Sequence, residues 1–150
     1  MPCGRLSAVS TESGAPPTSP SVVLLTVAHR IESELGAALA PLGLTVSRLG
    51  LLGHISGVPG VSFSDLARMS GISVQSVHTA VKALVAAGLV RDRTARAGAA
   101  STIELTPEGA RLLREAMAAV DAVDTQLFGP DADPALRQVG DAVRAAFSRL

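Results

Sequence analysis

The 150-residue chain is poor in several residue types, and each shortage excludes a kind of site. Cys3 is the single cysteine, which excludes an intramolecular disulfide and a cysteine-based zinc site. Aromatic residues make up 2% of the chain, with three Phe and neither Tyr nor Trp. Proteins that bind single-stranded nucleic acid stack the bases on aromatic rings, so this mode of binding is not expected.

Net charge and long apolar runs are also lacking. The formal net charge is zero, so any positive field must be local. No stretch approaches about 18 uncharged apolar residues, so we expect no transmembrane helix and no membrane partner. The N-terminal segment does not show a basic region followed by an apolar one. We therefore expect no signal peptide and a cytoplasmic protein.

Nothing in the sequence predicts catalysis, a metal or a cofactor. His29, His54 and His78 fall on three different predicted helices, without the spacing that metal ligands need. No nucleophile elbow, P-loop or dinucleotide fingerprint is found, so we expect no enzyme and no cofactor. Cys3 lies in a tail-like segment and is expected to be an inert thiol.

The composition divides the chain into a tail and a single helical domain. Residues 1–20 are rich in Ser, Pro, Gly and Thr and lack periodicity, which is typical of a disordered tail. Residues 21–150 form the domain, beginning with a helix over 21–42 whose apolar residues recur at steps of four and three. Helical patterns return over 107–150. Apolar residues make up 47% of the chain, and this excess points to a helical dimer interface.

The middle of the chain, residues 45–106, predicts a helix-turn-helix followed by a β-hairpin. A helix over 46–57, with Val46 facing the core, precedes two short helices capped by Ser62 and Ser73. The turn "MSGIS" joins these two helices, as the motif requires, and Met69 at its start is expected to be buried. Alternating residues then predict two strands, at 89–93 and 101–105. The predicted fold class is mainly α with a small β-hairpin wing.

The second helix of the motif has two different sides. Val74, Val77, Val81 and Leu84 form a predicted inner stripe. The predicted outer face is polar and consists of Gln75, Ser76, His78, Thr79 and Lys82. Side chains of these kinds can bond base edges in the major groove, and a merely solvated face would more often carry Glu and Lys. We interpret this face as a DNA-reading surface, with a wet, functionless face as the alternative.

The charges around this motif support DNA binding modestly. Over 61–101 the sequence carries five positive and two negative side chains, a balance of plus three. The positive residues are Arg68, Lys82, Arg91, Arg93 and Arg96, and the negative ones are Asp65 and Asp92. Contacts of such groups with phosphates make affinity fall as salt rises.

These features, taken in order, resemble the MarR family of winged helix-turn-helix regulators. The matching stretches are "LAPLGLTVSRLGLLGHI" (39–55), "VSFSDLARMSGISVQSVHTAVKALVAAGLV" (61–90) and "IELTPEGARLL" (103–113). The resemblance implies a homodimer built by the N- and C-terminal dimerisation helices, 21–42 and 107–150. It also implies binding of palindromic double-stranded DNA and, for many members, repression released by a small-molecule effector.

The resemblance also assigns site residues. Ser73 to Thr79 would begin the recognition helix, and Ser62 and Ser64 would cap the preceding helix near backbone phosphates. The wing would contribute Arg91, Arg93 and Arg96. Small ligands of relatives occupy a groove between the dimer helices and the middle domain, where this chain would offer His29, Arg30 and His54. Polar surface or dimer-contact residues remain the alternative for these three.

Two departures from the family pattern weaken the expected phosphate contacts. The wing tip usually carries an Asp and an Arg, whereas this chain has "RAGAA" there. Thr79 and Ala83 stand where basic residues are usual. The prediction is a DNA-binding transcription regulator, more often a repressor than an activator. The alternative is a dimeric small-molecule-binding or protein-interaction module that has kept the fold without DNA recognition.

Overall fold

The structure is a computed structural model that describes residues 19–93 and 102–148. Over these residues it holds six α-helices, one short 3-10 helix and a two-stranded sheet, which confirms the mainly α fold with a β-hairpin wing. The elements are α1 (Pro20–Leu39), η1 (Ala40–Leu42), α2 (Val46–Gly57), α3 (Phe63–Ser70), α4 (Val74–Ala86), β1 (Val90–Arg93), β2 (Thr102–Leu105), α5 (Pro107–Phe128) and α6 (Pro134–Phe147).

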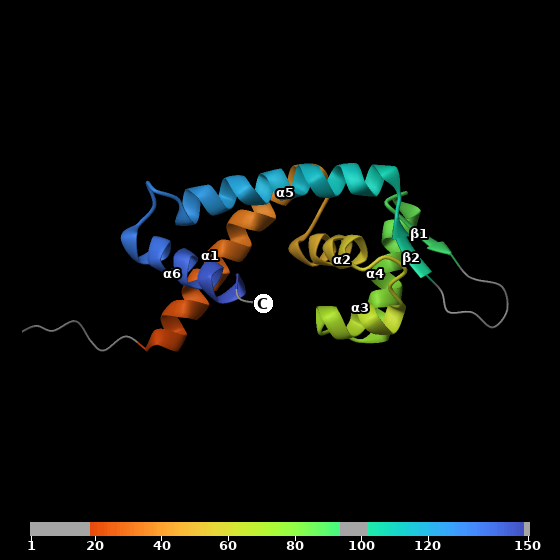
Figure 1. Cartoon of the computed structure of the whole chain (residues 1–150), viewed down its shortest axis with the longest axis horizontal. Coiled ribbons are helices and arrows are strands. Elements are labelled where there is room, and N and C mark those ends of the chain that lie inside the picture. Colours follow the sequence, from red (N-terminus) through yellow and green to blue (C-terminus); the bar gives the residue numbers. More distant parts are fainter. Residues whose placement is uncertain (1–18, 94–101, 149–150) are drawn as a thin grey trace, which may run out of the picture.

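The helices are arranged in two groups joined by α5 (Figure 1). The long α5 runs along one edge of the molecule, with α1 and α6 beside its C-terminal half. At its N-terminal end lie α2, α3, α4 and the hairpin. This arrangement separates a predicted dimerisation part from a predicted DNA-binding part.

The first helix differs slightly from its predicted bounds. It begins at Pro20, one residue earlier than expected, because proline suits the first turn of a helix and Ser19 takes the cap position. The α-helix ends at Leu39 and continues as a 3-10 turn through Leu42. The predicted disordered tail, residues 1–20, otherwise lies outside the described residues.

Capping residues and glycines set the limits of the helices in the middle of the chain. The side chains of Thr45, Ser62 and Ser73 each accept a hydrogen bond from a backbone N–H in the first turn that follows. This satisfies donors that the helix cannot pair internally. Gly71 ends α3 in the left-handed region at φ 66°, a conformation that other residues adopt at a cost.

One apolar core joins α2, α3, α4 and the hairpin. Fully buried side chains include Leu52, Leu66, Leu84 and Ile103, one from each of α2, α3, α4 and β2. The hairpin is antiparallel, with Val90 opposite Leu105, and a single bridge ties Val61 to Ile103. The wing is therefore attached to the helix-turn-helix through the core itself.

Three residues predicted to face the core are partly exposed instead. Val46, Met69 and Val74 have exposed fractions of 38, 40 and 42%. Val46 and Val74 are the first residues of α2 and α4, and Met69 is next to the end of α3. A helix end reaches beyond its packing partner, so periodicity overestimates burial there. The inner residues Val77, Val81 and Leu84 are buried as predicted.

Among the described residues, no single helix is long and apolar enough to cross a bilayer. Two consecutive segments, Pro20–Leu42 and Val46–Gly57, are together long and apolar enough by length and composition alone, and a bend of 74° separates them.

A close backbone contact joins α5 to the root of the wing. The Thr106 hydroxyl donates to the Gly88 carbonyl at 2.7 Å and accepts from the Gly109 N–H at 3.0 Å. The Thr106 N–H donates to the Leu89 carbonyl at 3.0 Å. A Cβ on Gly109 would lie 2.0 Å from that same Leu89 oxygen, so only glycine fits. The start of α5 is thereby fixed against the end of α4.

We therefore expect Gly109→Ala to lower the free energy of unfolding by about 3 kcal/mol, because the added methyl meets backbone that cannot move aside freely. Gly53→Ala is the matched control, since a Cβ on this helical glycine meets nothing within 4 Å. It should leave stability unchanged or raise it by up to about 1 kcal/mol. Urea unfolding followed by circular dichroism compares the two, and equal effects would contradict the proposed contact.

Candidate nucleic-acid interface

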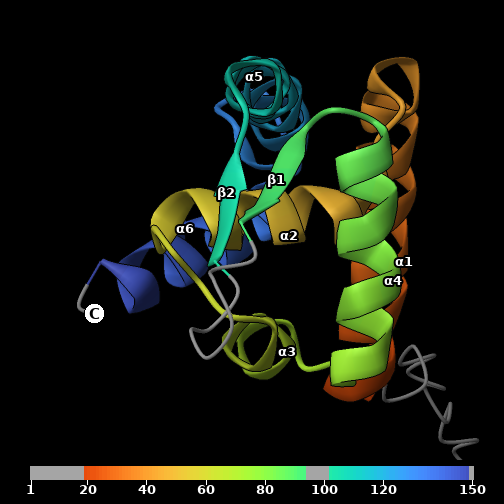
Figure 2. The same cartoon turned by 90° about the vertical axis from the view of Figure 1, so that its right-hand side faces the viewer.

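Helix α4 presents the predicted polar row to solvent. Ser73 caps the helix, and Val77, Val81 and Leu84 hold its inner side in the core. The residues of the predicted outer row are all exposed: Gln75, Ser76, His78, Thr79 and Lys82. In Figure 2, α4 runs along one side of the molecule, with α3 at its foot and the hairpin beside it. The row therefore lies on an accessible helix at the edge of the winged domain.

Beside this row lies a hollow of about 420 Å³. Three elements line it, α3, α4 and β1, through Phe63, Gln75, His78, Thr79, Val81, Lys82, Val85 and Asp92. The structure thus brings together four of the predicted DNA-binding residues. It adds Phe63 and Asp92, which the sequence analysis did not assign to the site.

Phe63 and His78 form a parallel ring stack. Their ring centroids are 3.8 Å apart, and the ring planes differ by 16°. Phe63 is the first residue of α3, whereas His78 lies in the second turn of α4. No local sequence pattern connects two residues so far apart, and the packing of the two helices alone creates the pair.

The polar groups of α4 differ in how far they are already engaged. The Ser73 and Ser76 hydroxyl oxygens lie 2.9 Å apart, and the Thr79 hydroxyl donates to the Gln75 carbonyl at 3.1 Å. Within the described part of the chain, the Gln75 amide, the His78 ring nitrogens and the Lys82 ammonium form no hydrogen bond or ion pair. These three groups are free to bind a ligand.

Ser62 and Ser64, both predicted near the phosphates, have different surroundings. The Ser62 hydroxyl accepts from the Asp65 N–H at 3.1 Å and donates to the Asp65 carboxylate at 2.7 Å. Arg68 pairs with the same carboxylate. Ser62 is thus the helix cap, whereas Ser64 is exposed and has no hydrogen bond within residues 19–93 and 102–148.

This small network alters the acidity of Asp65. The hydrogen bond from the Ser62 hydroxyl is the main cause that lowers its pKa from the usual 3.8, and the Arg68 charge acts in the same direction. Desolvation raises the pKa and offsets part of this lowering; its effect is smaller than that of the Ser62 hydrogen bond and larger than that of the Arg68 charge. The carboxylate therefore remains ionised and helps hold the beginning of α3, the turn that carries Phe63.

The positive charge of the site is smaller than the sequence count suggests. Arg93 forms an ion pair with Glu104 across the hairpin at 3.5 Å, and Arg68 is paired with Asp65. With Glu104 included, the sequence over 61–105 carries five positive and three negative side chains, a net charge of plus two. Arg91 and Lys82 have no ion-pair partner among the described residues, and Arg96 lies outside them.

The three predicted ligand contacts are not brought together within one chain. His54 is half-buried and lines a hollow of about 300 Å³ between α2, α3 and α4, together with Arg48 and Ser70. The Ser70 hydroxyl is buried and has no hydrogen-bond partner within the described residues. His29 and Arg30 are exposed on α1 and do not line this hollow.

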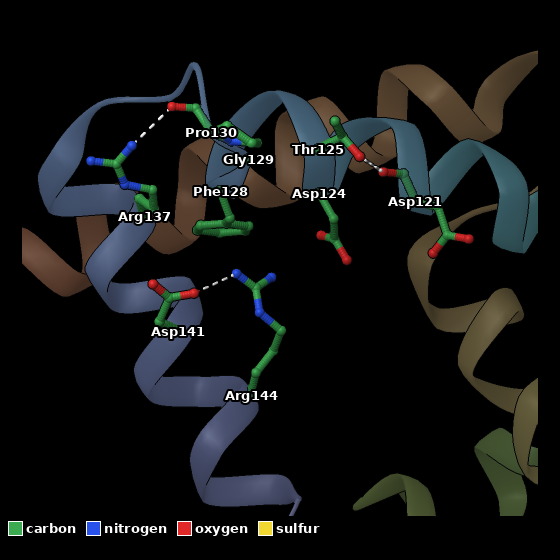
Figure 3. A pocket seen from close by; sticks show the side chains of 9 residues that line it. All are labelled: Asp121, Asp124, Thr125, Phe128, Gly129, Pro130, Arg137, Asp141 and Arg144. Carbon is green, nitrogen blue, oxygen red and sulfur yellow. Dashed lines mark hydrogen bonds and ion pairs between the residues drawn. The ribbon is translucent and has the colours of Figure 1, made fainter.

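A further hollow, of about 650 Å³, lies at the corner between α5 and α6 (Figure 3). Asp124 of α5 and Arg144 of α6 point into it, and the Phe128 ring lies between the two helices. Arg144 pairs with Asp141 of its own helix at 2.8 Å, and Arg137 donates to the Pro130 carbonyl at 2.9 Å. The Arg137 bond ties α6 to the turn that follows α5, whereas the Arg144 pair lies within α6.

Comparison with known proteins decides the family. The MarR family model matches residues 42–99. The chain is 32% identical over 117 residues to the HTH-type transcriptional repressor Rv2887 of Mycobacterium tuberculosis. The aligned region covers 77% of this chain and 84% of that protein. The chain belongs to the MarR family of winged helix-turn-helix transcription regulators. A member of this family is a transcription regulator and not an enzyme.

Solved structures of the same relative agree with this MarR-family fold. The complex of Rv2887 with DNA has a TM-score of 0.71 and 28% sequence identity, and covers 86% of this chain and 98% of that chain. The complex of Rv2887 with salicylic acid has a TM-score of 0.68 and 28% identity, and covers 89% and 99%. The winged helix-turn-helix described above is thus the family's fold.

The lowered pKa of Asp65 predicts a pH-dependent stability. Its ionised form stabilises the folded chain above the usual 3.8, and this contribution is lost as pH falls through the lower folded-state pKa. We expect Asp65→Asn to melt at a lower temperature than wild type at neutral pH, and the difference to vanish in acid.

Thermal melting followed by circular dichroism over a pH series measures this difference. Ser64→Ala is the control, because Ser64 lies in the same turn without a hydrogen bond within the described residues. It should follow the wild type at every pH. A deficit of Asp65→Asn that persists unchanged in acid would show that ionised Asp65 does not stabilise α3.

Proposed function

We propose that the protein is a homodimeric, sequence-specific DNA-binding repressor that binds palindromic double-stranded DNA and is released by a small molecule. The observation that carries the proposal is the exposed outer row of α4, in which Gln75, His78 and Lys82 have free polar groups beside a hollow. The DNA complex of the relative Rv2887 supports the same role for this chain. Such a role places the protein in the cytoplasm, with the DNA.

The site residues divide between base and phosphate contacts. Gln75 and His78 read base edges, because an amide and an imidazole can both donate and accept. Lys82 and Arg91 contact phosphates as unpaired cations. The hydroxyls of Ser73, Ser76 and Thr79 add secondary hydrogen bonds to the DNA. Ser62 and Ser64 lie near the DNA backbone. Arg93 attracts phosphates less strongly because Glu104 is beside it. Arg96 is a further proposed phosphate contact.

The homodimer would form through α1 and α6. Four consecutive apolar residues of α1, 22–25, are between 43 and 71% exposed. On α6, Val143 is 52% exposed and Phe147 is 70% exposed. Exposed apolar surface of this extent marks an interface in small proteins. A second copy of the chain would cover it and place two α4 helices on successive half-sites of the DNA.

The effector would act through the groove between the dimer helices and the winged domain. His54 already lines a hollow with Arg48, whereas His29 and Arg30 lie on α1. We infer that these side chains come together only in the assembled dimer. A ligand held there would favour one spacing of the two reading helices, and DNA affinity would change by that preference. The relative's complex with salicylic acid supports an effector of similar size.

A titration against DNA tests the proposed function. The purified protein is titrated by fluorescence anisotropy against the duplex upstream of its own gene and against a scrambled duplex, at two salt concentrations. We expect a salt-dependent preference for the upstream duplex. Equal, weak binding to both duplexes would instead favour the dimeric ligand-binding or protein-interaction module.

Two variants separate base from phosphate contacts in the same titration. Gln75→Ala should reduce discrimination at one base position per half-site by about 1–3 kcal/mol, with the salt dependence unchanged. Arg91→Ala should weaken all duplexes alike and lower the salt slope by about one per chain. An exchange of the two behaviours would show that the roles are assigned to the wrong residues.

The dimer interface is tested by a charge on α6. Val143→Asp should yield monomers in light scattering, because a carboxylate cannot be buried there without a partner. Gln138→Asp is the control, since this exposed residue lies on another side of the same helix. The control should remain dimeric, and an intact dimer in both variants would place the interface elsewhere.

A further inference from the structure

The stack of Phe63 on His78 has a consequence for how α4 presents a hydrogen-bonding group. The two rings are nearly parallel, at a centroid distance of 3.8 Å. His78 is exposed and Phe63 is half-buried against the core. One face of the imidazole is therefore covered, while its edge, which carries both ring nitrogens, remains accessible. The stack restrains the plane of the ring and leaves its hydrogen-bonding atoms free.

A restrained ring is a better base reader than a mobile one. An exposed histidine on a helix samples several rotamers, and binding must select one of them. Ordering such a side chain on binding costs conformational entropy and weakens association. Phe63 orders the ring before DNA arrives, so the contact forms with less loss of entropy. It also limits which base edge the nitrogens can meet, and this sets specificity.

Phe63 is itself firmly placed. It follows the cap residue Ser62, whose hydroxyl bonds both the backbone and the carboxylate of Asp65. Just before the cap, the Val61 carbonyl accepts a hydrogen bond at 3.3 Å from the Ile103 N–H of β2. The aromatic partner of His78 is therefore held by the start of α3 and by the root of the wing, independently of α4.

Among the described neighbours of His78, Phe63 makes the specific contact with its ring. Gln75 and Lys82 lie one turn before and after it on the same helix, and Asp92 lies across the hollow on β1. Within the described residues, no hydrogen bond or ion pair joins any of them to the imidazole. The orientation of the ring therefore depends on Phe63.

We propose that Phe63 is a positioning residue that determines DNA specificity through His78. It makes no base contact itself, and it fixes the plane in which the imidazole meets one base pair of each half-site. The proposal rests on the proposed DNA-binding function. It differs from that function in assigning specificity to a residue outside the recognition helix.

The test uses selection from a randomised duplex library, followed by anisotropy titration of the selected duplex and its single-base variants. Four proteins are compared with wild type: His78→Ala, Phe63→Leu, Phe63→Tyr and the double variant Phe63→Leu/His78→Ala. Phe63→Leu keeps an apolar side chain without a ring, and Phe63→Tyr keeps the ring. Thermal melting establishes that each variant is folded at the titration temperature.

We expect His78→Ala to lose discrimination at one base position per half-site. Phe63→Leu should lose about three- to ten-fold of discrimination at that same position, the worth of one hydrogen bond. Its discrimination elsewhere and its salt dependence should match wild type. Phe63→Tyr should retain the wild-type base preference. The double variant should be no less selective than His78→Ala. A merely structural role of Phe63 would instead weaken all positions together.

A second measurement tests the stack without DNA. In proton–carbon spectra of the free protein, the His78 ring signals should be shifted by the Phe63 ring current. The shift should disappear in Phe63→Leu and persist in Phe63→Tyr.

The outcomes separate the two proposals. Wild type that binds every duplex alike would overturn the proposed function and this inference with it. Selective wild type, with Phe63→Leu equally selective at the His78 position, would overturn the inference alone.

Discussion

The burial of one side of α4 is the constraint on which the rest of the site depends. Val77, Val81 and Leu84 are at most 2% exposed, packed with residues of α2, α3 and the hairpin. Each such side chain contributes roughly 1.5–3 kcal/mol when it leaves water. With 3.6 residues per turn, a helix fixed by this stripe turns Gln75 and His78 outward. The same packing therefore stabilises the domain and aims its polar groups.

Local pairing shapes the electrostatics of the interface. Asp65 pairs with Arg68 and Glu104 pairs with Arg93, so Lys82 and Arg91 are the unpaired cations among the described residues of the site. Exposed ion pairs of this kind add little stability, and their main effect here is on the field that DNA would meet. Under the proposed function, this pairing shifts recognition by the surface toward hydrogen bonds and shape and away from attraction to phosphates. A free Gln75 amide and an ordered His78 ring suit that balance.

The two parts of the molecule are coupled through α5. This helix of 22 residues begins at the contact of Thr106 and Gly109 with the end of α4 and ends at the corner with α6. At that corner a Cβ on Gly140 would lie 2.8 Å from the Phe128 Cβ, so α6 also approaches α5 closely. Gly109 meets backbone at one end of α5, and Gly140 packs on the Phe128 side chain at the other, so a shift among the dimer helices would reach the wing through α5. This is a physical route by which the proposed effector would alter DNA binding.

The local pattern of the sequence determined most of the fold. Capping residues, glycines and periodicity placed the helices and strands of the winged domain to within about two residues, because these signals act between near neighbours in the chain. They also identified the outer row of α4, since the buried stripe and the polar row follow one helical period. Burial was overestimated at helix ends, as for Val46 and Met69, because periodicity does not show where a packing partner stops.

Contacts between distant segments were decided by the tertiary structure alone. The stack of Phe63 on His78, the pairing of Arg93 with Glu104 and the approach of Gly109 to Leu89 each join residues from different elements. No spacing rule relates such residues, because their separation in space follows from the packing of whole helices and strands. The sequence by itself therefore determined which polar groups of α4 face outward, and the tertiary structure decided which of them are held, paired or free.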